Sequence, residues 1–108
     1  MEKDFILLAC GSGASSGFMA SSMRKAAKKQ GLDVKVKAVS DSEIEEYTDM
    51  IDVLLIGPHI SYLEDELKEV AQEKGFPLIV IPQNIYGTLD GAKAMDLVKE
   101  ELDQKNRG

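Results

Sequence analysis

Apolar and polar positions along this 108-residue chain follow two kinds of pattern. Short, nearly unbroken apolar runs predict strands buried on both faces, and apolar residues spaced by three and four predict helices with one buried face. The predicted strands are residues 5–10, 34–38, 53–56 and 78–81. The apolar stripes of the predicted helices span residues 18–27, 44–47, 60–71 and 89–102. Strands and helices therefore alternate strictly.

The ends of these elements carry their own signals. Ser40 and Glu43 have the spacing of a capping box, which predicts a short helix capped by side chains at that point. Residues 103–108 carry no apolar stripe, and we expect them to fray. The residues that break helices or bound strands are Gly31, Gly75, Pro77 and Pro82.

Strict alternation of strands and helices predicts one α/β domain over residues 1–108, with a parallel sheet and helices on both faces. Lys35 and Lys37 alternate with apolar residues in the second strand, which places that strand at an edge. Right-handed crossovers then favour the strand order 2-1-3-4, a flavodoxin-like or cysteine-phosphatase-like arrangement. This order has a switch point between the first and third strands, and we expect the functional site at their carboxyl ends.

Small residues follow the first strand at that switch point. They are Gly11, Ser12, Gly13, Ala14, Ser15, Ser16 and Gly17, directly after Cys10. A turn of this kind before a helix presents several backbone N–H groups to one point, so it predicts an anion cradle. The same N–H groups would lower the pKa of the Cys10 thiol and make it a nucleophile. The alternatives are a tight turn with no ligand and a buried, inert cysteine.

Composition narrows the classes of function. Thirteen Lys and Arg against nineteen Asp and Glu give a net charge of −6, which disfavours binding to nucleic acid. With one cysteine and one histidine, His59, we expect no internal disulfide and no structural metal site. Neither a signal pattern nor a membrane-spanning apolar run occurs, so we expect a cytoplasmic protein that is not embedded in the membrane. His59 is either a polar residue closing a strand or a second reactive group.

Known phosphate motifs do not match the turn after Cys10. No lysine has the P-loop spacing, and Ser16 stands where a dinucleotide fingerprint has its third glycine. In the C-x5-R pattern of cysteine phosphatases an arginine grips the phosphate, but here that position is again Ser16. Arg24 comes two helical turns later. A cradle with a thiol and no arginine is better suited to holding a phosphoryl group than to hydrolysing it.

The ordered set of motifs resembles a known family, the B component of the lactose/cellobiose class of the bacterial phosphoenolpyruvate-dependent sugar phosphotransferase system. The resemblance extends over nearly the whole chain. The residues that carry it are Cys10, Gly13, Ser15, Ser16, Met23, Gly31-Leu32-Asp33-Val34, Ala38-Val39-Ser40, Leu55-Ile56-Gly57-Pro58, Tyr62-Leu63, Tyr86-Gly87 and Asp90-Gly91. The chain departs from the family pattern at Gly17, where serine is frequent, and at His59, where glutamine is usual.

The resemblance implies a phosphotransferase that works through phosphocysteine and needs no bound cofactor. Cys10 would accept a phosphoryl group from a phosphohistidine on the A component. It would pass the group to a β-glucoside such as cellobiose, bound by the membrane C component during uptake. A phosphate-ligand binding module and a cysteine-dependent phosphatase of similar fold are the alternatives.

Charge is distributed unevenly along the chain. Residues 24–37 contain six basic side chains and one acid, whereas residues 41–73 contain eleven acids and one base. Such blocks are solvated surfaces in the simplest interpretation, and they can also steer a charged partner.

Overall fold

The computed structural model describes residues 4–10 and 13–107, with the side chains of this part other than 10, 13–16, 59, 61 and 104–107. Its elements, in chain order, are β1 (Asp4–Cys10), α1 (Gly13–Lys29), β2 (Val34–Ser40), η1 (Asp41–Tyr47), β3 (Val53–Ile56), η2 (Pro58–Leu63), α2 (Glu64–Lys74), β4 (Leu78–Val80), α3 (Gln83–Gly87) and α4 (Gly91–Arg107). The elements η1 and η2 are 3-10 helices.

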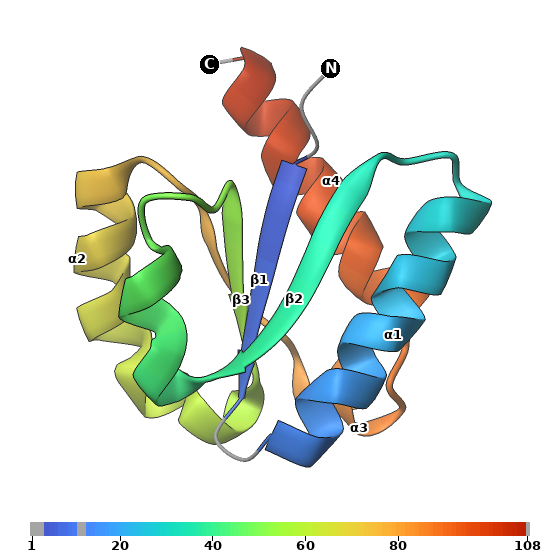
Figure 1. Ribbon diagram of the computed structural model, residues 1–108, viewed down its shortest axis with the longest axis horizontal. Helices are drawn as coiled ribbons and strands as arrows, with labels where there is room; N and C mark the ends of the chain where they lie inside the picture. Colours follow the sequence, from blue (N-terminus) through green and yellow to red (C-terminus); the bar gives the residue numbers. More distant parts are fainter. Residues whose placement is uncertain (1–3, 11–12, 108) are drawn as a thin grey trace.

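The apolar runs form one parallel sheet with the order β2-β1-β3-β4, as predicted. Ile6 in β1 lies opposite Val36 on one side and Val53 on the other. β1 and β3 are therefore central, and the lysine-bearing β2 is at an edge (Figure 1). The crossovers cover both faces, with α1 and α4 against one face and η1 and α2 against the other.

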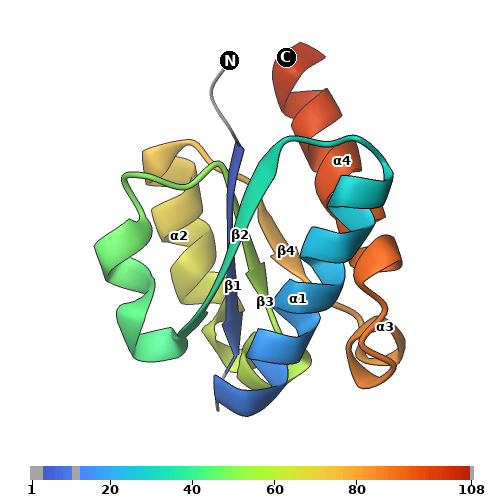
Figure 2. The same cartoon turned by 45° about the vertical axis from the view of Figure 1, so that its right-hand side comes forward.

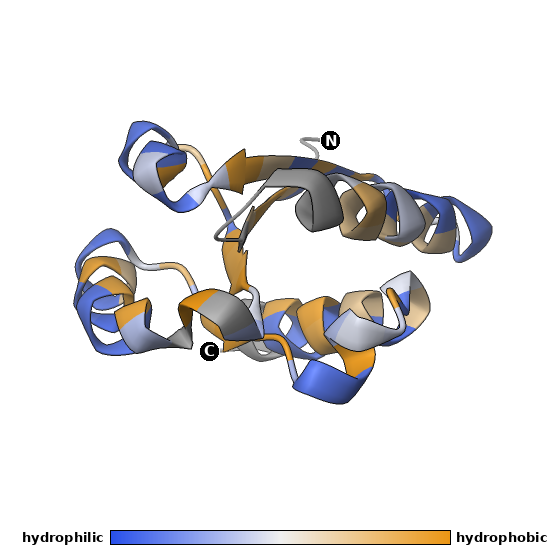
Figure 3. Cartoon of the chain, turned by 90° about the horizontal axis from the view of Figure 1, so that it is seen from below, coloured by the Kyte–Doolittle hydropathy of each residue, from blue (hydrophilic) through white to orange (hydrophobic). Residues whose placement is uncertain are grey.

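Two apolar cores lie on either side of the sheet. Leu8 and Leu55 pack among the residues of α1 and α4, whereas Leu7 and Leu54 pack among those of η1 and α2. All four leucines are fully buried. Figure 3, which looks onto the carboxyl ends of the strands, shows the apolar colour on the sheet and on the helix sides that face it. Each buried leucine contributes about 1.5–3 kcal/mol to the stability of the fold, so these side chains help to hold the central strands in place.

α1 begins earlier than the apolar pattern predicts. The stripe was expected to start at Phe18, but the helix starts at Gly13. Phe18 is itself 68% exposed, so its assignment to the buried stripe is wrong, whereas Met19 and Met23 are fully buried. The first turn of α1 consists of Gly13, Ala14, Ser15 and Ser16, whose small side chains give no helical apolar period.

The capping box predicted at Ser40 is absent. Ser40 has the extended backbone of an N-cap residue, with φ −82° and ψ 163°, but its side chain makes no capping hydrogen bond. Its hydroxyl instead lies 3.1 Å from the hydroxyl of Ser42. The element that follows Ser40 is a 3-10 helix, which is wound more tightly than an α-helix. The backbone N–H that a capping side chain would bind is therefore not where it would be in an α-helix.

The later helices also differ from the sequence pattern. The helix predicted over 60–71 is divided into η2 and α2. The helix predicted over 89–102 is α4, which begins at Gly91 and continues to Arg107. Residues 103–107, which we expected to fray, therefore form the end of α4. The five-residue helix α3 was not predicted. Within the described part of the chain, no helix combines the length and the apolar character needed to cross a bilayer.

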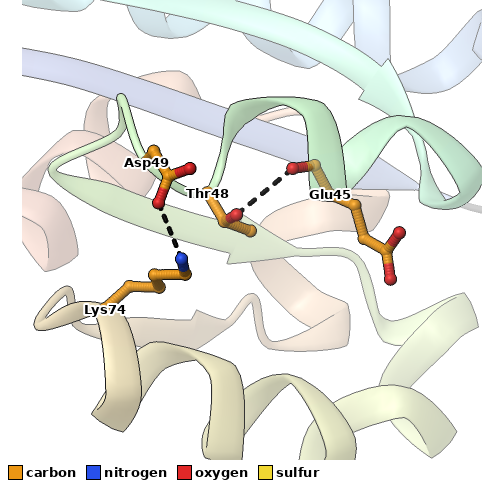
Figure 4. Close-up of polar contacts among 4 residues, drawn as sticks. All are labelled: Glu45, Thr48, Asp49 and Lys74. Atoms are coloured by element: carbon orange, nitrogen blue, oxygen red, sulfur yellow. Dashed lines mark hydrogen bonds and ion pairs between the residues drawn. The ribbon is translucent and has the colours of Figure 1, made fainter.

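The end of α2 is fixed by Gly75 and by a contact with the loop after η1. Gly75 has φ 82° and donates its N–H to Ala71 O at 2.8 Å, a left-handed cap that glycine adopts at low cost. The Lys74 ammonium lies 2.7 Å from the Asp49 carboxylate (Figure 4). This hydrogen bond raises the pKa of Lys74 above its ordinary value of 10.5, and the charge of Asp49 raises it further. One residue before Asp49, the Thr48 hydroxyl donates to Glu45 O at 3.2 Å.

Candidate functional site

Cys10 is the last residue of β1, at the switch point of the sheet. Its Cα partner is Ser40 on β2, and the preceding carbonyl, Ala9 O, accepts a hydrogen bond from Gly57 N at 2.9 Å. Ile81 N donates to Ile56 O at 2.9 Å in the same manner. The carboxyl ends of β1, β3 and β4 thus lie side by side at the same end of the sheet, as the predicted topology required.

The strand that leads to Cys10 is held firmly. Leu7, Leu8 and Ala9 are all fully buried, and β1 is paired on both sides. A residue at the end of such a strand is held in place by its neighbours and does not depend on a mobile loop for its position. The backbone of Cys10 is therefore fixed in position at the carboxyl end of the sheet.

The turn after Cys10 is shorter than we predicted, because most of the expected cradle is helical. Gly13, Ala14, Ser15, Ser16 and Gly17 form the first turns of α1. Gly11 and Ser12 lie outside the described residues. The first four N–H groups of an α-helix have no partner within the helix, and the helix dipole favours negative charge there. The anion cradle of the sequence interpretation thus corresponds to the N-terminus of a 17-residue helix.

α1 is anchored well behind this terminus. The Ser22 hydroxyl donates to Leu89 O at 3.0 Å and accepts a hydrogen bond from Gly91 N at 3.0 Å. A side chain at Gly91 would collide with the backbone of Ser22, so α1 and the start of α4 touch there. This contact holds the axis of α1, and with it the N-terminus that follows Cys10.

Two large apolar side chains near this edge are exposed. Phe18 is in the second turn of α1, and Tyr62, which is 74% exposed, is in η2 just after β3. Gly17 is also exposed, and a Cβ built there meets no atom within 4 Å. Exposed aromatic residues are enriched where proteins bind other proteins. The sequence pattern missed the exposure of Phe18, because its spacing fits the buried stripe.

Arg24 does not supply the arginine that a cysteine phosphatase would need. Its Nε donates to Val36 O on the edge strand β2 at 2.9 Å, so the side chain is directed to the sheet edge. His59 follows Gly57-Pro58 in η2, and its side chain lies outside the described part of the structure. Gln83 and Asn84, which follow the carboxyl end of β4, begin α3 and are exposed.

The fold and the site together define a class: a doubly wound α/β domain whose single cysteine ends a central strand at the switch point, just ahead of a helix N-terminus. The family model described as PTS system, Lactose/Cellobiose specific IIB subunit matches residues 5–97. The chain belongs to this family.

Relatives with related names match over most of their length. The oligo-beta-mannoside-specific EIIB component of Bacillus subtilis is 35% identical over 91 residues, which cover 84% of this chain and 88% of that one. The galactose-specific and cellobiose-specific EIIB components of Lactococcus lactis are each 33% identical over 100 residues, covering 88% of this chain and 93% of each relative. Longer relatives match this chain over only part of their own length. The lactose-specific EIICB component of Streptococcus mutans is 28% identical, and the match covers 18% of that protein.

Solved structures agree with the fold. The lactose-specific IIB domain of Streptococcus pneumoniae superimposes with a TM-score of 0.84 at 18% identity, covering 93% of this chain and 98% of that one. The cellobiose-specific IIB component of Borrelia burgdorferi gives a TM-score of 0.79 at 29% identity, covering 96% and 95%. The chain is thus a IIB component of the sugar phosphotransferase system, a phosphotransferase in sugar transport. The alternatives of a ligand-binding module and a cysteine phosphatase are not favoured.

Proposed function

We propose that Cys10 carries the phosphoryl group. The single observation that supports this most directly is its position, at the end of a doubly paired central strand and three residues before the N-terminus of α1. A thiolate there would be stabilised by the helix dipole and by the free N–H groups of residues 13–16, and so would the phosphate oxygens after transfer. Gly11, Ser12 and Gly17 complete the proposed cradle.

In the first step, the Cys10 Sγ thiolate attacks the phosphorus of a phosphohistidine on the A component. The S–P bond forms and the P–N bond breaks, and the electron pair of that bond returns to the imidazole nitrogen. In the second step, a sugar hydroxyl held by the membrane C component attacks the phosphorus. The S–P bond then breaks, the electron pair returns to sulfur, and the hydroxyl proton passes to a base on the C component. The thiolate is regenerated without a net change in oxidation state.

These partners place the protein at the cytoplasmic side of the membrane, where a lone thiol stays reduced. We propose a β-glucoside such as cellobiose as the sugar, because the Tyr86-Gly87 and Asp90-Gly91 motifs resemble the cellobiose-like subgroup of the family more than the lactose-like one. The relatives named for oligo-beta-mannoside, galactose and cellobiose match at nearly equal identity. A comparison of uptake-coupled phosphorylation among these three sugars therefore tests the assignment directly.

Replacement of Cys10 by serine tests the carrier role. Cys10→Ser should fold normally, because the substitution replaces one sulfur by an oxygen and keeps the shape of the side chain. It should lose phosphoryl acceptance, since a serine hydroxyl is not ionised near neutral pH. Intact-protein mass spectrometry after incubation with phosphoenolpyruvate and the upstream components would detect the added phosphate. Undiminished phosphorylation of Cys10→Ser would contradict the proposal, and phosphorylation lost from a matched Ser21→Ala control would point to damage elsewhere in α1.

A phosphatase with the same nucleophile would behave differently. The first turn of α1 contains no arginine, and Arg24 is bonded to β2, so rapid attack by water on phosphocysteine is not expected. Wild-type protein should turn over little p-nitrophenyl phosphate. Steady turnover abolished by Cys10→Ser would favour the hydrolase instead, and turnover abolished by His59→Ala would assign a reactive role to the histidine.

A further inference from the structure

Apart from the proposed cradle, the structure has a basic surface on α1 that lies away from Cys10. A cleft of about 700 Å³ opens between α1 and the start of α4, where the two helices run side by side (Figures 1 and 2). Its lining residues are Ser22, Lys25, Ala26, Lys28, Lys29, Leu89, Asp90, Gly91 and Ala92. Residue 27 of α1 lies about 20 Å along the helix from residue 14, at 1.5 Å per residue. We call this cleft the α1–α4 groove, and it is separate from the proposed cradle.

The basic side chains of residues 24–37 divide into two groups in the structure. Arg24 donates to Val36 O at 2.9 Å, Lys35 lies 4.8 Å from the ring centre of Phe5, and Lys37 lies 5.6 Å from that of Tyr47. Each of these three cations thus has an intramolecular partner. The other three are the lysines of the α1–α4 groove.

Lys25, Lys28 and Lys29 are exposed and occupy one side of α1, at spacings of three and four residues. None of them forms a hydrogen bond or ion pair with any other residue in the part of the chain that the structure describes. Three like charges on neighbouring positions repel one another, at a cost that a bound anion would relieve.

On the α4 side of the groove, the polar groups already form hydrogen bonds within the fold. The Asp90 carboxylate accepts Lys93 N at 3.1 Å and so caps α4, and the Ser22 hydroxyl bridges Leu89 O and Gly91 N. Leu89 has φ 53°, a left-handed conformation that is rare for a leucine. This strain is held in place by the same hydrogen bonds, and it shapes the wall of the groove.

The shape of the groove favours a small ligand over a partner helix. A helix-binding groove offers large apolar pockets at helical spacing, but here the apolar lining is Ala26, Gly91, Ala92 and one larger residue, Leu89. A volume of about 700 Å³ is within the range of small-molecule sites. Ammonium groups bind phosphate oxygens as point charges, and Asp90 can accept hydrogen bonds from ligand hydroxyls.

We propose that the α1–α4 groove binds a phosphomonoester of a small polyhydroxy compound, with Lys25, Lys28 and Lys29 around the phosphate and Asp90 facing the hydroxyl groups. This site goes beyond the proposed carrier function and does not depend on it. Failure to bind the ligand would leave the role of Cys10 untouched.

The test is a titration of the ¹⁵N-labelled full chain, followed by its amide resonances, with glucose 6-phosphate, inorganic phosphate and glucose as probes. Glucose 6-phosphate should give saturable shifts of residues 22–29 and 89–92, with a Kd of about 1 mM or tighter. Glucose should give none, and inorganic phosphate should bind more weakly. Because the amides of residues 13–17 report the proposed cradle, phosphate that binds near Cys10 would be recognised separately.

Two triple variants complete the test. Lys25→Gln/Lys28→Gln/Lys29→Gln should weaken binding by about tenfold or more, since losing one charge-assisted hydrogen bond has an effect of that size. Lys35→Gln/Lys68→Gln/Lys99→Gln removes the same charge outside the groove and should leave the Kd nearly unchanged. The proposal is overturned by the absence of saturable shifts, by equal weakening in both triple variants, or by binding of glucose alone. Equal affinity for both phosphate probes would overturn the polyhydroxy part of it.

Discussion

Gly17 is the residue at which the proposed cradle lacks a hydroxyl that is frequent in the family. It lies inside α1 with open space around its Cα, and its backbone is not in the left-handed region. Nothing in the fold therefore requires glycine there. Glycine within a helix costs roughly 0.5–1 kcal/mol relative to alanine.

We predict that Gly17→Ala stabilises the protein by up to about 1 kcal/mol, and Gly17→Ser by about half of that. Urea unfolding followed by circular dichroism would measure both changes. Gly17→Ser should also accept phosphate faster than Gly17→Ala, because only serine adds a donor to the cradle. A loss of stability in Gly17→Ala would show that this part of α1 is more crowded than the structure indicates.

Gly75 provides the opposite case at the end of α2. Its φ of 82° places it in the region where a side chain meets the following carbonyl. We predict that Gly75→Ala destabilises the protein by about 1–2 kcal/mol, by the same unfolding measurement. Equal effects of Gly75→Ala and Gly17→Ala would contradict the conformational argument for both positions.

At the scale of elements, the contact between α1 and the start of α4 supports both the proposed cradle and the α1–α4 groove. Gly91 has no room for a Cβ against the Ser22 backbone, so Gly91→Ala must move one helix away from the other. We predict a loss of about 1–3 kcal/mol in stability, the usual cost of overpacking. We also predict a changed alkylation rate of Cys10 in the folded variant, because the N-terminus of α1 would shift. An unaltered alkylation rate would show that the helix axis does not control the thiol.

The central strands could be predicted from the sequence because β1 and β3 are apolar runs buried on both faces, and the edge strand β2 because Lys35 and Lys37 alternate with apolar residues. The same reasoning located Cys10 at the switch point, since alternation and handedness together fix the strand order. The short elements could not be predicted. α3 contains only two buried apolar residues, Ile85 and Tyr86, which are too few to show a helical period.

Other features depend on contacts between distant residues and so leave no local signal. The groove exists because Ser22 bonds to Leu89 and Gly91, which are 67 and 69 residues away in the chain. Phe18 has helical spacing but lies on the first turns of α1, where its side chain is left exposed. The capping box at Ser40 failed because the element that follows is a 3-10 helix.

Across the whole molecule, the charge blocks of the sequence become opposite sides of the sheet. Lys25, Lys28 and Lys29 lie on α1, while η1 and α2, on the other face, carry nine of the eleven acids of residues 41–73. Lys74 is a cation on the acidic side, and Asp49 is its partner (Figure 4). This exposed pair is screened by salt, so it makes a modest, condition-dependent contribution to stability.

We predict that wild type is slightly more stable than Asp49→Asn near neutral pH, and that high salt reduces the difference. The pKa of Lys74 is raised in the folded state, so the folded protein holds this proton more tightly than the unfolded chain. The stabilisation is therefore complete below the ordinary lysine pKa of 10.5 and is lost as pH rises through the folded value. Melting temperatures of both proteins across this range would measure it, and a difference that grows with alkalinity would contradict the assignment.

The start of β1 at Asp4 and the end of α4 at Arg107 both lie at the amino-terminal end of the strands, opposite the end that bears Cys10 (Figures 1 and 2). A tag or fused domain at either of these points would thus leave the proposed phosphorylation site uncovered. The domain measures 33 × 32 × 21 Å, so a tether must reach around about 30 Å of protein to bring its cargo to the thiol. A flexible linker has a mean span of about 5–6 Å times the square root of its length, and roughly 30 residues match that distance. At that length the local concentration of a tethered partner would be greatest, and only linkers of fewer than about 10 residues would be too short to reach the thiol.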